Sequence, residues 1–297
     1  MVVICRRCEE CPMTIAHRDA RDYQIIFLCS FLSLGILARD WSLTPLAIAI
    51  ILTTTLVVQC LFTINQQGNF GRWFSLHTWQ SFLGHQGWKS ALITGLGLCL
   101  LLRANHLSTL ILASSLAIAS KFLLQAWGKH WFNPANFGII AALTLTGDAW
   151  VSPGQWGTTL WLGAMFLAAG GLVLGRVGRW DTSVMFLVVY AGLDLLRNAW
   201  LGWPPEVSFH HLENGSLLVF ALFMLTDPRS IPNGRPARLI WSTAIAMVSL
   251  ILQYYFYLPT ALFWALFLLS PLTVLLDRQF PAPRFQWWQK AKPVPSN

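Results

Sequence analysis

Apolar runs of about 15 to 20 residues recur along this chain of 297 residues, from Tyr23 to Leu276. A helix of about 20 apolar residues is long enough to cross the hydrocarbon core of a bilayer. A soluble fold of this size needs a polar exterior, yet 55% of the residues are hydrophobic and only 11% are charged. The runs therefore predict an all-α polytopic integral membrane protein whose main partner is the lipid bilayer, with no soluble domain between the runs.

Charged residues, prolines and glycines divide the runs into about ten predicted transmembrane helices. Several runs are shorter than an upright crossing needs, so we expect broken or re-entrant segments among them. The chain then divides into a cytoplasmic N-terminal tail (1–22), a ten-helix membrane domain (23–277) and a cytoplasmic C-terminal tail (278–297). The predicted helices lie near 23–38, 44–64, 89–103, 106–125, 134–151, 156–176, 181–199, 214–226, 237–257 and 259–276.

Basic residues are distributed unevenly between the two sides of this predicted topology. Of the 20 Lys and Arg residues, only Arg39, Arg103 and Arg197 fall on one side. Because Lys and Arg accumulate in cytoplasmic loops, the asymmetry predicts a multi-pass protein of the bacterial inner membrane with both termini in the cytoplasm. The net charge of +8 is dispersed between the runs rather than gathered in one stripe, so we expect no nucleic-acid partner.

Three cysteines in the N-terminal tail are weak candidates for metal ligands. Cys5, Cys8 and Cys11 have the C-x2-C-x2-C spacing of part of an iron–sulfur ligand run, but the fourth cysteine is missing. In a reducing cytoplasm these thiols either hold a cluster or a zinc ion with His17 or another chain, or they are incidental cysteines of a tail. Both interpretations remain open.

A polar segment precedes the predicted helix near 134. Asn133 is suited to cap this helix, and Pro134 is suited to its first turn, where no amide hydrogen is needed. Ordinary capping explains both residues. The sharper hypothesis is that the free N–H groups of the helix start, with Asn133, Pro134 and Asn136 around them, bind an anion or a flavin ring carbonyl.

The segment Thr226-Asp227-Pro228 ends another apolar run. A carboxylate at that depth is costly unless it is paired or faces a polar cavity. Asp227 either pairs with Arg229 or Arg235 and anchors a turn, or it coordinates a cation or shapes a cofactor pocket. The spacing does not choose between these interpretations.

Two segments, KHWFNPANFG at 129–138 and FALFMLTDPRSIPNGRPARLIW at 220–241, resemble the NqrB/RnfD family of membrane proteins, which belong to the sodium-translocating NADH:quinone reductase and to the Rnf electron transport complex. The resemblance runs from about Arg21 to Arg278. It implies the ten-helix fold of that family, a bound flavin, a part in electron transport coupled to cation transport, and other electron-transport subunits as partners.

The resemblance also bears on how a flavin is held. Family members with covalent FMN use the threonine of a Ser-Gly-Ala-Thr motif, and placing that motif nine residues before the threonine of the T-D-P turn aligns its threonine with Leu217. Leu217 has no hydroxyl, which argues against covalent FMN and implies at most a non-covalent FMN or riboflavin. The residues that the resemblance then places near a flavin are Asn214, Gly215, Ser216, Thr226 and Asp227.

The stretch HHLENGSLLVFALFMLTDPR is more similar to the stand-alone, UnbU-like relatives encoded beside enediyne-type biosynthetic genes. No catalytic residue follows from this resemblance, and whether the chain acts as an enzyme stays open. The alternative function is a flavin-free transporter, channel or accessory protein on the same scaffold.

Overall fold

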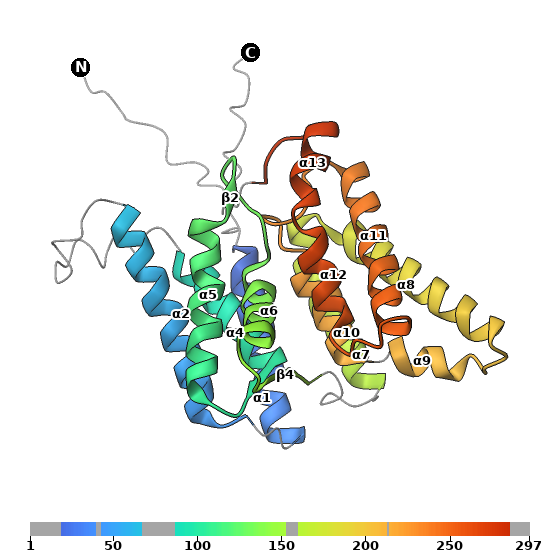
Figure 1. Cartoon of the computed structure of the whole chain (residues 1–297), viewed down its shortest axis with the longest axis horizontal. Helices are drawn as coiled ribbons and strands as arrows, with labels where there is room; N and C mark the ends of the chain where they lie inside the picture. Colours follow the sequence, from blue (N-terminus) through green and yellow to red (C-terminus); the bar gives the residue numbers. More distant parts are fainter. Residues whose placement is uncertain (1–18, 40–42, 67–86, 153–159, 213, 286–297) are drawn as a thin grey trace, which may run out of the picture.

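The computed structural model of the chain describes residues 19–39, 43–66, 87–152, 160–212 and 214–285, and it confirms the predicted all-α polytopic membrane fold (Figure 1). The elements in chain order are α1 (Ala20–Arg39), α2 (Pro45–Gln66), α4 (Gly87–Leu101), β1 (Leu102–Ala104), α5 (Leu107–Leu123), β2 (Gln125–Ala126), β3 (Lys129–His130), α6 (Pro134–Leu145), β4 (Ala149–Val151), α7 (Leu160–Val177), α8 (Trp180–Trp200), α9 (Glu206–Leu212), α10 (Gly215–Val219), the π-helix η2 (Phe220–Met224), α11 (Arg235–Tyr254), α12 (Ala261–Leu269) and α13 (Leu272–Gln279).

Each of the ten predicted segments overlaps one helix or one broken pair of helices, and the short helix α9 was not predicted. Among the described residues, α1, α2 and α11 are long and apolar enough to cross a membrane alone, and α12 with α13 forms a fourth candidate span bent by 50°. Helices α4, α5, α6 and the continuous segment α10–η2 are apolar but shorter. The expectation of broken segments is thus confirmed, while ten full crossings remain a prediction.

The prediction of one helix over 134–151 is wrong at its C-terminal end. Helix α6 stops at Leu145, and Ala149–Val151 instead pairs antiparallel with Leu102–Ala104 as the β1–β4 ladder. The cause is Asp148, whose carboxylate accepts a hydrogen bond from the backbone N–H of His106 at 2.9 Å and another from the Thr109 hydroxyl at 2.7 Å. These bonds turn the chain back toward the start of α5.

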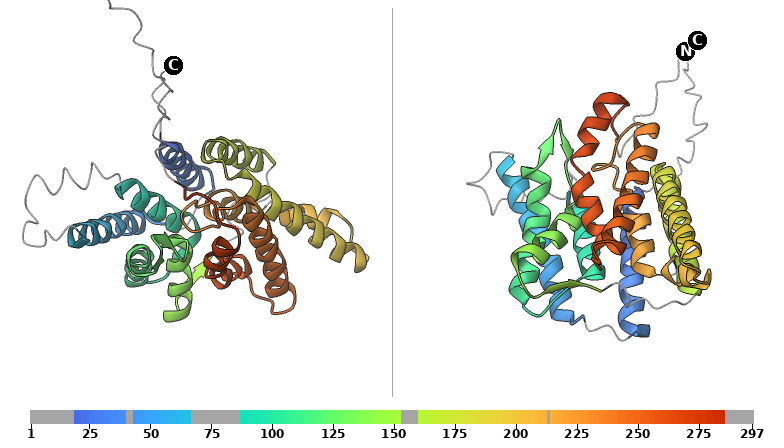
Figure 2. Two further views of the ribbon diagram at one scale, coloured as in Figure 1. Left: turned by 90° about the horizontal axis from the view of Figure 1, so that it is seen from above. Right: turned by 45° about the vertical axis from the view of Figure 1, so that its right-hand side comes forward.

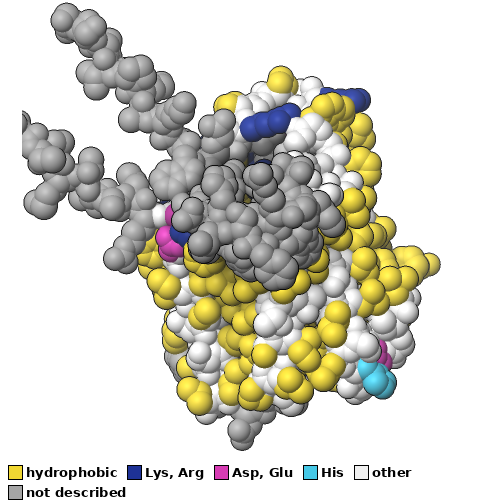
Figure 3. All heavy atoms as spheres, turned by 90° about the vertical axis from the view of Figure 1, so that its left-hand side faces the viewer, with side chains coloured by type: hydrophobic (Ala, Val, Ile, Leu, Met, Phe, Trp, Pro, Cys, Tyr) yellow, Lys and Arg dark blue, Asp and Glu magenta, His cyan; other side chains and the backbone are white. Residues whose placement is uncertain are grey.

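The helices form two groups side by side (Figure 1). On one side α2 packs on α4 and α5, and α5 packs on α6; on the other, α11 packs on α8 and α12. Helices α1, α7 and α10 lie between the groups, as the view from above also shows (Figure 2). The face shown in Figure 3 is mainly hydrophobic, as a surface against lipid requires.

The π-helix η2 lies at the centre of the aromatic core. The Phe220 ring lies 5.5 Å from that of Phe186 and 5.8 Å from that of Phe263, measured between centroids, and Phe223 meets Phe31 edge-on. The i→i+5 hydrogen bond from Leu225 N–H to the Phe220 carbonyl, 2.8 Å, closes the wide turn. Single π turns of this kind often occur at functional sites.

Candidate functional site

A cavity of about 470 Å³ lies between the group formed by α2, α4, α5 and α6 and the central segments α1, α7 and η2, at the end where the β2–β3 hairpin stands. We call it the main cavity. Its wall includes Asn133 and Pro134 from one of the two segments singled out in the sequence and Thr226 and Asp227 from the other. Tertiary structure therefore brings together two motifs that are distant along the chain.

Asn133 joins these two motifs directly. Its Oδ1 accepts a hydrogen bond from the Asn136 backbone N–H at 3.1 Å, which caps α6, and Pro134 occupies the first turn. Its Nδ2 donates to the Met224 carbonyl, 3.1 Å away at the end of η2. The predicted cap is confirmed, and the same side chain also satisfies a carbonyl of the π-helix.

Asn136 lies behind the cavity wall rather than on it. Its Nδ2 donates to the Phe263 carbonyl at 3.1 Å and so ties α6 to α12. The side chain is fully buried, and its Oδ1 has no hydrogen-bond partner among the described residues. Its predicted contact with a cofactor remains a hypothesis.

The T-D-P turn is held by local hydrogen bonds. The Thr226 hydroxyl donates to the Leu222 carbonyl at 2.7 Å, and the Asp227 carboxylate accepts from the Arg229 backbone N–H at 3.2 Å and the Ser230 hydroxyl at 3.1 Å. The suggested ion pair of Asp227 with Arg229 or Arg235 is not found in the described part of the chain. Arg235 instead lies 3.8 Å from Asp181. Asp227 is therefore a carboxylate on the cavity wall without a salt bridge to the described residues.

Three further wall residues were not recognised from the sequence. Lys121, buried in α5, donates to the carbonyl and the hydroxyl of Ser90, each at 3.1 Å, and no carboxylate of the described residues lies within 4 Å of it. Burial lowers the pKa of His130 to about 4, so this ring is neutral at pH 7. His130 Nδ1 and Gln59 Oε1 are both buried without a described partner.

Buried polar atoms without partners are rare in folded proteins, and several at one cavity indicate an ordered water or a polar ligand. The Lys121 amine is buried on the same wall and donates to Ser90. The wall thus offers a nitrogen donor at Lys121 and an acceptor at Gln59. Lys121 had one sequence signal, because an ionisable residue inside an apolar run is a functional candidate by default.

The second set of predicted residues lies at the other end of the α10–η2 segment. Asn214 caps α10 by accepting from the Ser216 backbone N–H at 2.9 Å, and Gly215 and Ser216 are buried in its first turn. Ten residues of helix, about 15 Å, separate this start from Thr226. Asn214, Gly215 and Ser216 do not line the main cavity, and neither does the buried Leu217.

The cysteine candidates of the tail, Cys5, Cys8 and Cys11, lie outside the described residues, as do most of the two predicted tails and residues 67–86. Among the described ranges, no group of three or more His, Cys, Asp or Glu side chains is arranged to hold a metal ion. Cys99 is buried in the core, as expected for a small hydrophobe, whereas Cys29 is exposed.

The fold and the main cavity define a multi-pass α-helical membrane protein with a chamber that has several polar wall residues, beside the central segments α1, α7 and η2. Residues 144–286 match the model of the NQR2, RnfD, RnfE family, which makes this part of the chain similar to that family. This match covers η2 and the T-D-P turn, and it begins after the capping Asn133.

Curated relatives carry names from the same family. The D subunit of the ion-translocating oxidoreductase complex of Stutzerimonas stutzeri is 30% identical over 119 residues, which are 38% of this chain and 33% of that protein. The protein of the same name in Cronobacter sakazakii is 30% identical over 161 residues, 53% of this chain and 43% of its own. The D subunit of the Na(+)-translocating ferredoxin:NAD(+) oxidoreductase complex of Acetobacterium woodii is 25% identical over 180 residues, 54% of each chain. The matched region thus spans between a third and about half of these relatives.

Proposed function

We propose that this chain is a membrane subunit that takes part in electron transport coupled to cation transport, and that it holds a flavin, FMN or riboflavin, non-covalently in the main cavity. The names of the relatives support the first part. The observation that carries the second part is the meeting of both motifs at one cavity whose wall contains Lys121, Gln59 and His130 with unmet hydrogen-bonding capacity.

The residues present fit such a ligand. The volume of about 470 Å³ falls in the range of about 300 to 1,000 Å³ typical of cofactor pockets. A flavin ring has carbonyl oxygens that can accept from Lys121 and a ring N–H that can donate to Gln59 Oε1. A bound flavin supplies electron transfer, while the chain contributes binding, orientation and the exclusion of water.

Attachment is proposed to be non-covalent because the position aligned with the family's modified threonine is Leu217. Its side chain is buried and apolar, and it offers no oxygen for a phosphoester.

The absorption spectrum of the protein purified in detergent tests the flavin proposal. We expect a flavin spectrum that passes entirely into the supernatant after acid precipitation. A coloured pellet would contradict non-covalent binding, and a protein that stays colourless after incubation with excess riboflavin and excess FMN would overturn the cofactor assignment.

A matched pair of variants locates the site. Lys121→Met should lower the flavin content several-fold, because it removes the buried amine donor of the cavity wall. Lys89→Met is the control: it removes an ammonium that is paired with Asp22 at 2.5 Å and does not line the cavity. Equal flavin content in the two variants would place the flavin elsewhere.

The second candidate is a flavin-free transporter or channel. The observation that favours it is the breakage of helices inside the bundle, at η2 and at the 50° bend between α12 and α13, because broken helices beside a polar cavity are typical of transporters. Ion flux into proteoliposomes that contain flavin-free protein supports this function, and absence of flux contradicts it.

The topology is part of the proposal. We place both termini in the cytoplasm, with the tails at 1–22 and 278–297 available to other electron-transport subunits. Labelling from outside intact cells of the cysteines in the N-terminal tail, and of a cysteine introduced at Ser296, tests this placement, and labelling of either terminus would contradict it.

A further inference from the structure

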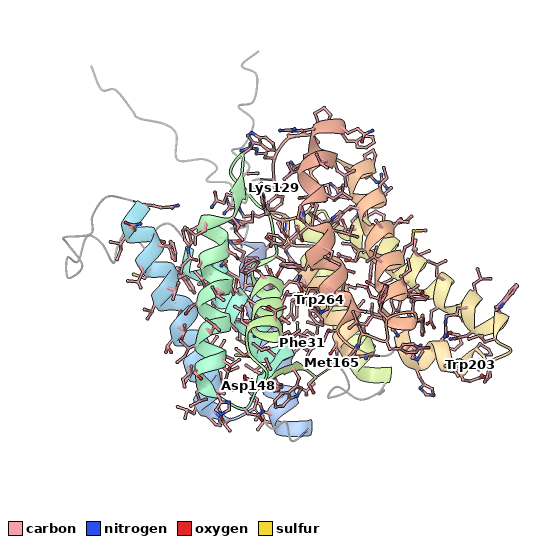
Figure 4. The ribbon with its side chains drawn as sticks, viewed as in Figure 1. Phe31, Lys129, Asp148, Met165, Trp203 and Trp264 are labelled. Carbon is pink, nitrogen blue, oxygen red and sulfur yellow. The ribbon has the colours of Figure 1, made fainter. Side chains whose placement is uncertain are left out.

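A second, shallower cavity of about 220 Å³ lies at the same end of the molecule as the β2–β3 hairpin. We call it the hairpin–α13 cavity. It lies between the hairpin, the loop that contains Asn233, and the end of α13 with the residues that follow it; Figure 4 labels Lys129, which lies on its wall. It shares no lining residue with the main cavity.

The charges around the hairpin–α13 cavity are not balanced. Lys129 is paired with Asp277 at 2.5 Å, and the same carboxylate accepts the Asn233 backbone N–H at 2.7 Å. Arg278 and Arg284 also line the cavity, but no carboxylate of the described residues lies within 4 Å of either guanidinium. Within the described residues, the concave surface therefore has two guanidinium groups without a carboxylate partner.

The tip of the hairpin has an unusual backbone conformation at Trp127, whose indole ring is exposed. Trp127 and Gly128 have φ values of 49° and 74°, as the two central residues of a type I′ turn require. Asn, Asp or Gly normally occupies the first of these positions, and a bulky residue there is unusual. Trp127 is nevertheless 57% exposed, and its ring lies 4.5 Å from the Arg278 guanidinium.

The position along the membrane normal suits a lipid headgroup. The cavity adjoins the last turn of α13, where the bent α12–α13 span ends. Exposed Trp beside Arg at the end of a span is typical of the headgroup level. Basic pockets at such places bind anionic lipids, and a guanidinium can donate two parallel hydrogen bonds to a phosphate.

We infer that the hairpin–α13 cavity binds the phosphate of an anionic phospholipid headgroup, with Arg278 and Arg284 as the donors and Trp127 packed at the interface beside the lipid. The site is independent of the flavin proposal, since it needs only the membrane fold. Its open shape and the exposed indole favour a lipid over a free phosphate ion.

Native mass spectrometry of the detergent-solubilised full chain, titrated with phosphatidylglycerol or phosphatidylcholine, tests this inference. We expect selective retention of phosphatidylglycerol. The double variant Arg278→Gln with Arg284→Gln should weaken its binding about ten-fold or more, equivalent to about 1.4 kcal/mol. Arg235→Gln is the matched control, because this exposed arginine lies outside the cavity.

A second variant separates binding from folding. Trp127→Asn gives the turn its preferred residue, so the unfolding midpoint should stay equal or rise while binding of phosphatidylglycerol weakens several-fold. Equal affinity for the two lipids, or undiminished phosphatidylglycerol binding by the double arginine variant, would overturn the inference. Displacement of the lipid by excess inorganic phosphate would identify a free-phosphate site and overturn the lipid assignment.

Discussion

Two short helical segments of this protein, α6 and α10–η2, are built alike but end differently. Each begins with a capping asparagine, Asn133 or Asn214, and each ends at a threonine whose hydroxyl donates to the carbonyl four residues earlier. The two run in opposite directions, since the Asn133 side chain meets the end of η2 at the Met224 carbonyl (Figure 1).

The difference lies in what surrounds the acidic residue at each end. Asp148, after α6, accepts bonds from His106 and Thr109 next to the β1–β4 ladder, so that end is closed (Figure 4). Asp227, after η2, accepts hydrogen bonds only from its own turn among the described residues, and it lines the main cavity. The same local pattern thus gives a structural corner in one place and a cavity wall in the other, because different elements pack against it.

The largest expected effect is the difference in stability loss between variants of the two capping residues, Asn133 and Asn214. Asn133→Ala should destabilise the protein by about 2 to 3 kcal/mol, because it removes a cap and leaves the buried Met224 carbonyl with only the long hydrogen bond from the Asp227 backbone N–H. Asn214→Ala should cost only about 1 kcal/mol, the usual value of a cap. Unfolding in mixed micelles by a denaturing detergent measures both, and equal losses would contradict the linking role of Asn133.

The second effect concerns the close glycine contacts by which each segment packs against a neighbouring helix. A Cβ at Gly138 in α6 would lie 2.6 Å from the Ala113 carbonyl oxygen, so Gly138→Ala should cost about 1 to 3 kcal/mol. A Cβ at Gly170 would meet the side chain of Leu222 in η2 at 2.7 Å, which can adjust in part, and the loss should be smaller. Gly171→Ala, which meets nothing within 4 Å, is the control and should be neutral or slightly stabilising. The same micellar unfolding assay ranks the three variants, and a loss for Gly171→Ala as large as for Gly138→Ala would contradict the packing argument.

The third effect is pH dependence, which should differ between the two ends. Burial holds the pKa of His130 at about 4, below its ordinary 6.5, so the unfolded chain takes up this proton first as the pH falls. Stability should be full above pH 6.5 and fall by up to about 1.4 kcal/mol per pH unit toward pH 4. His130→Gln should remove this slope, as measured by unfolding between pH 4 and 7.

Asp148 should affect stability in a lower pH range than His130. Hydrogen bonds from Thr109 and His106 hold the pKa of this carboxyl below its ordinary 3.8. Its contribution to stability is therefore present above pH 3.8 and lost only as the pH falls further. Asp148→Asn should remove the loss of unfolding free energy below pH 3.8. If this loss were the same in the variant, Asp148 would not stabilise the turn after α6.

The smallest expected effect is that of Asp227→Asn. The amide oxygen can still accept from the turn, so the free energy of unfolding should change by less than about 1 kcal/mol. Flavin content should change more than stability, because the carboxylate is on the cavity wall. A large loss of stability with unchanged flavin content would show that Asp227 acts in folding alone.

The sequence by itself determined the membrane class and the positions of the helices, because length and hydropathy are local properties and the bilayer permits few alternatives. It also identified Asn133 as a cap and the T-D-P turn as a helix end, since both depend on neighbouring residues. The comparisons support the family that these segments resembled.

Only the tertiary structure decided which polar groups share a cavity. It placed Lys121 and Gln59 beside the two motifs, put His130 of the first motif on the same cavity wall, left Asn136 behind the wall, and separated Asn214 and Ser216 from Thr226 by the length of a helix. It also ended α6 at Leu145, through a bond between Asp148 and a residue 42 positions away. Such contacts join residues distant in sequence, and neither periodicity nor local propensity contains them.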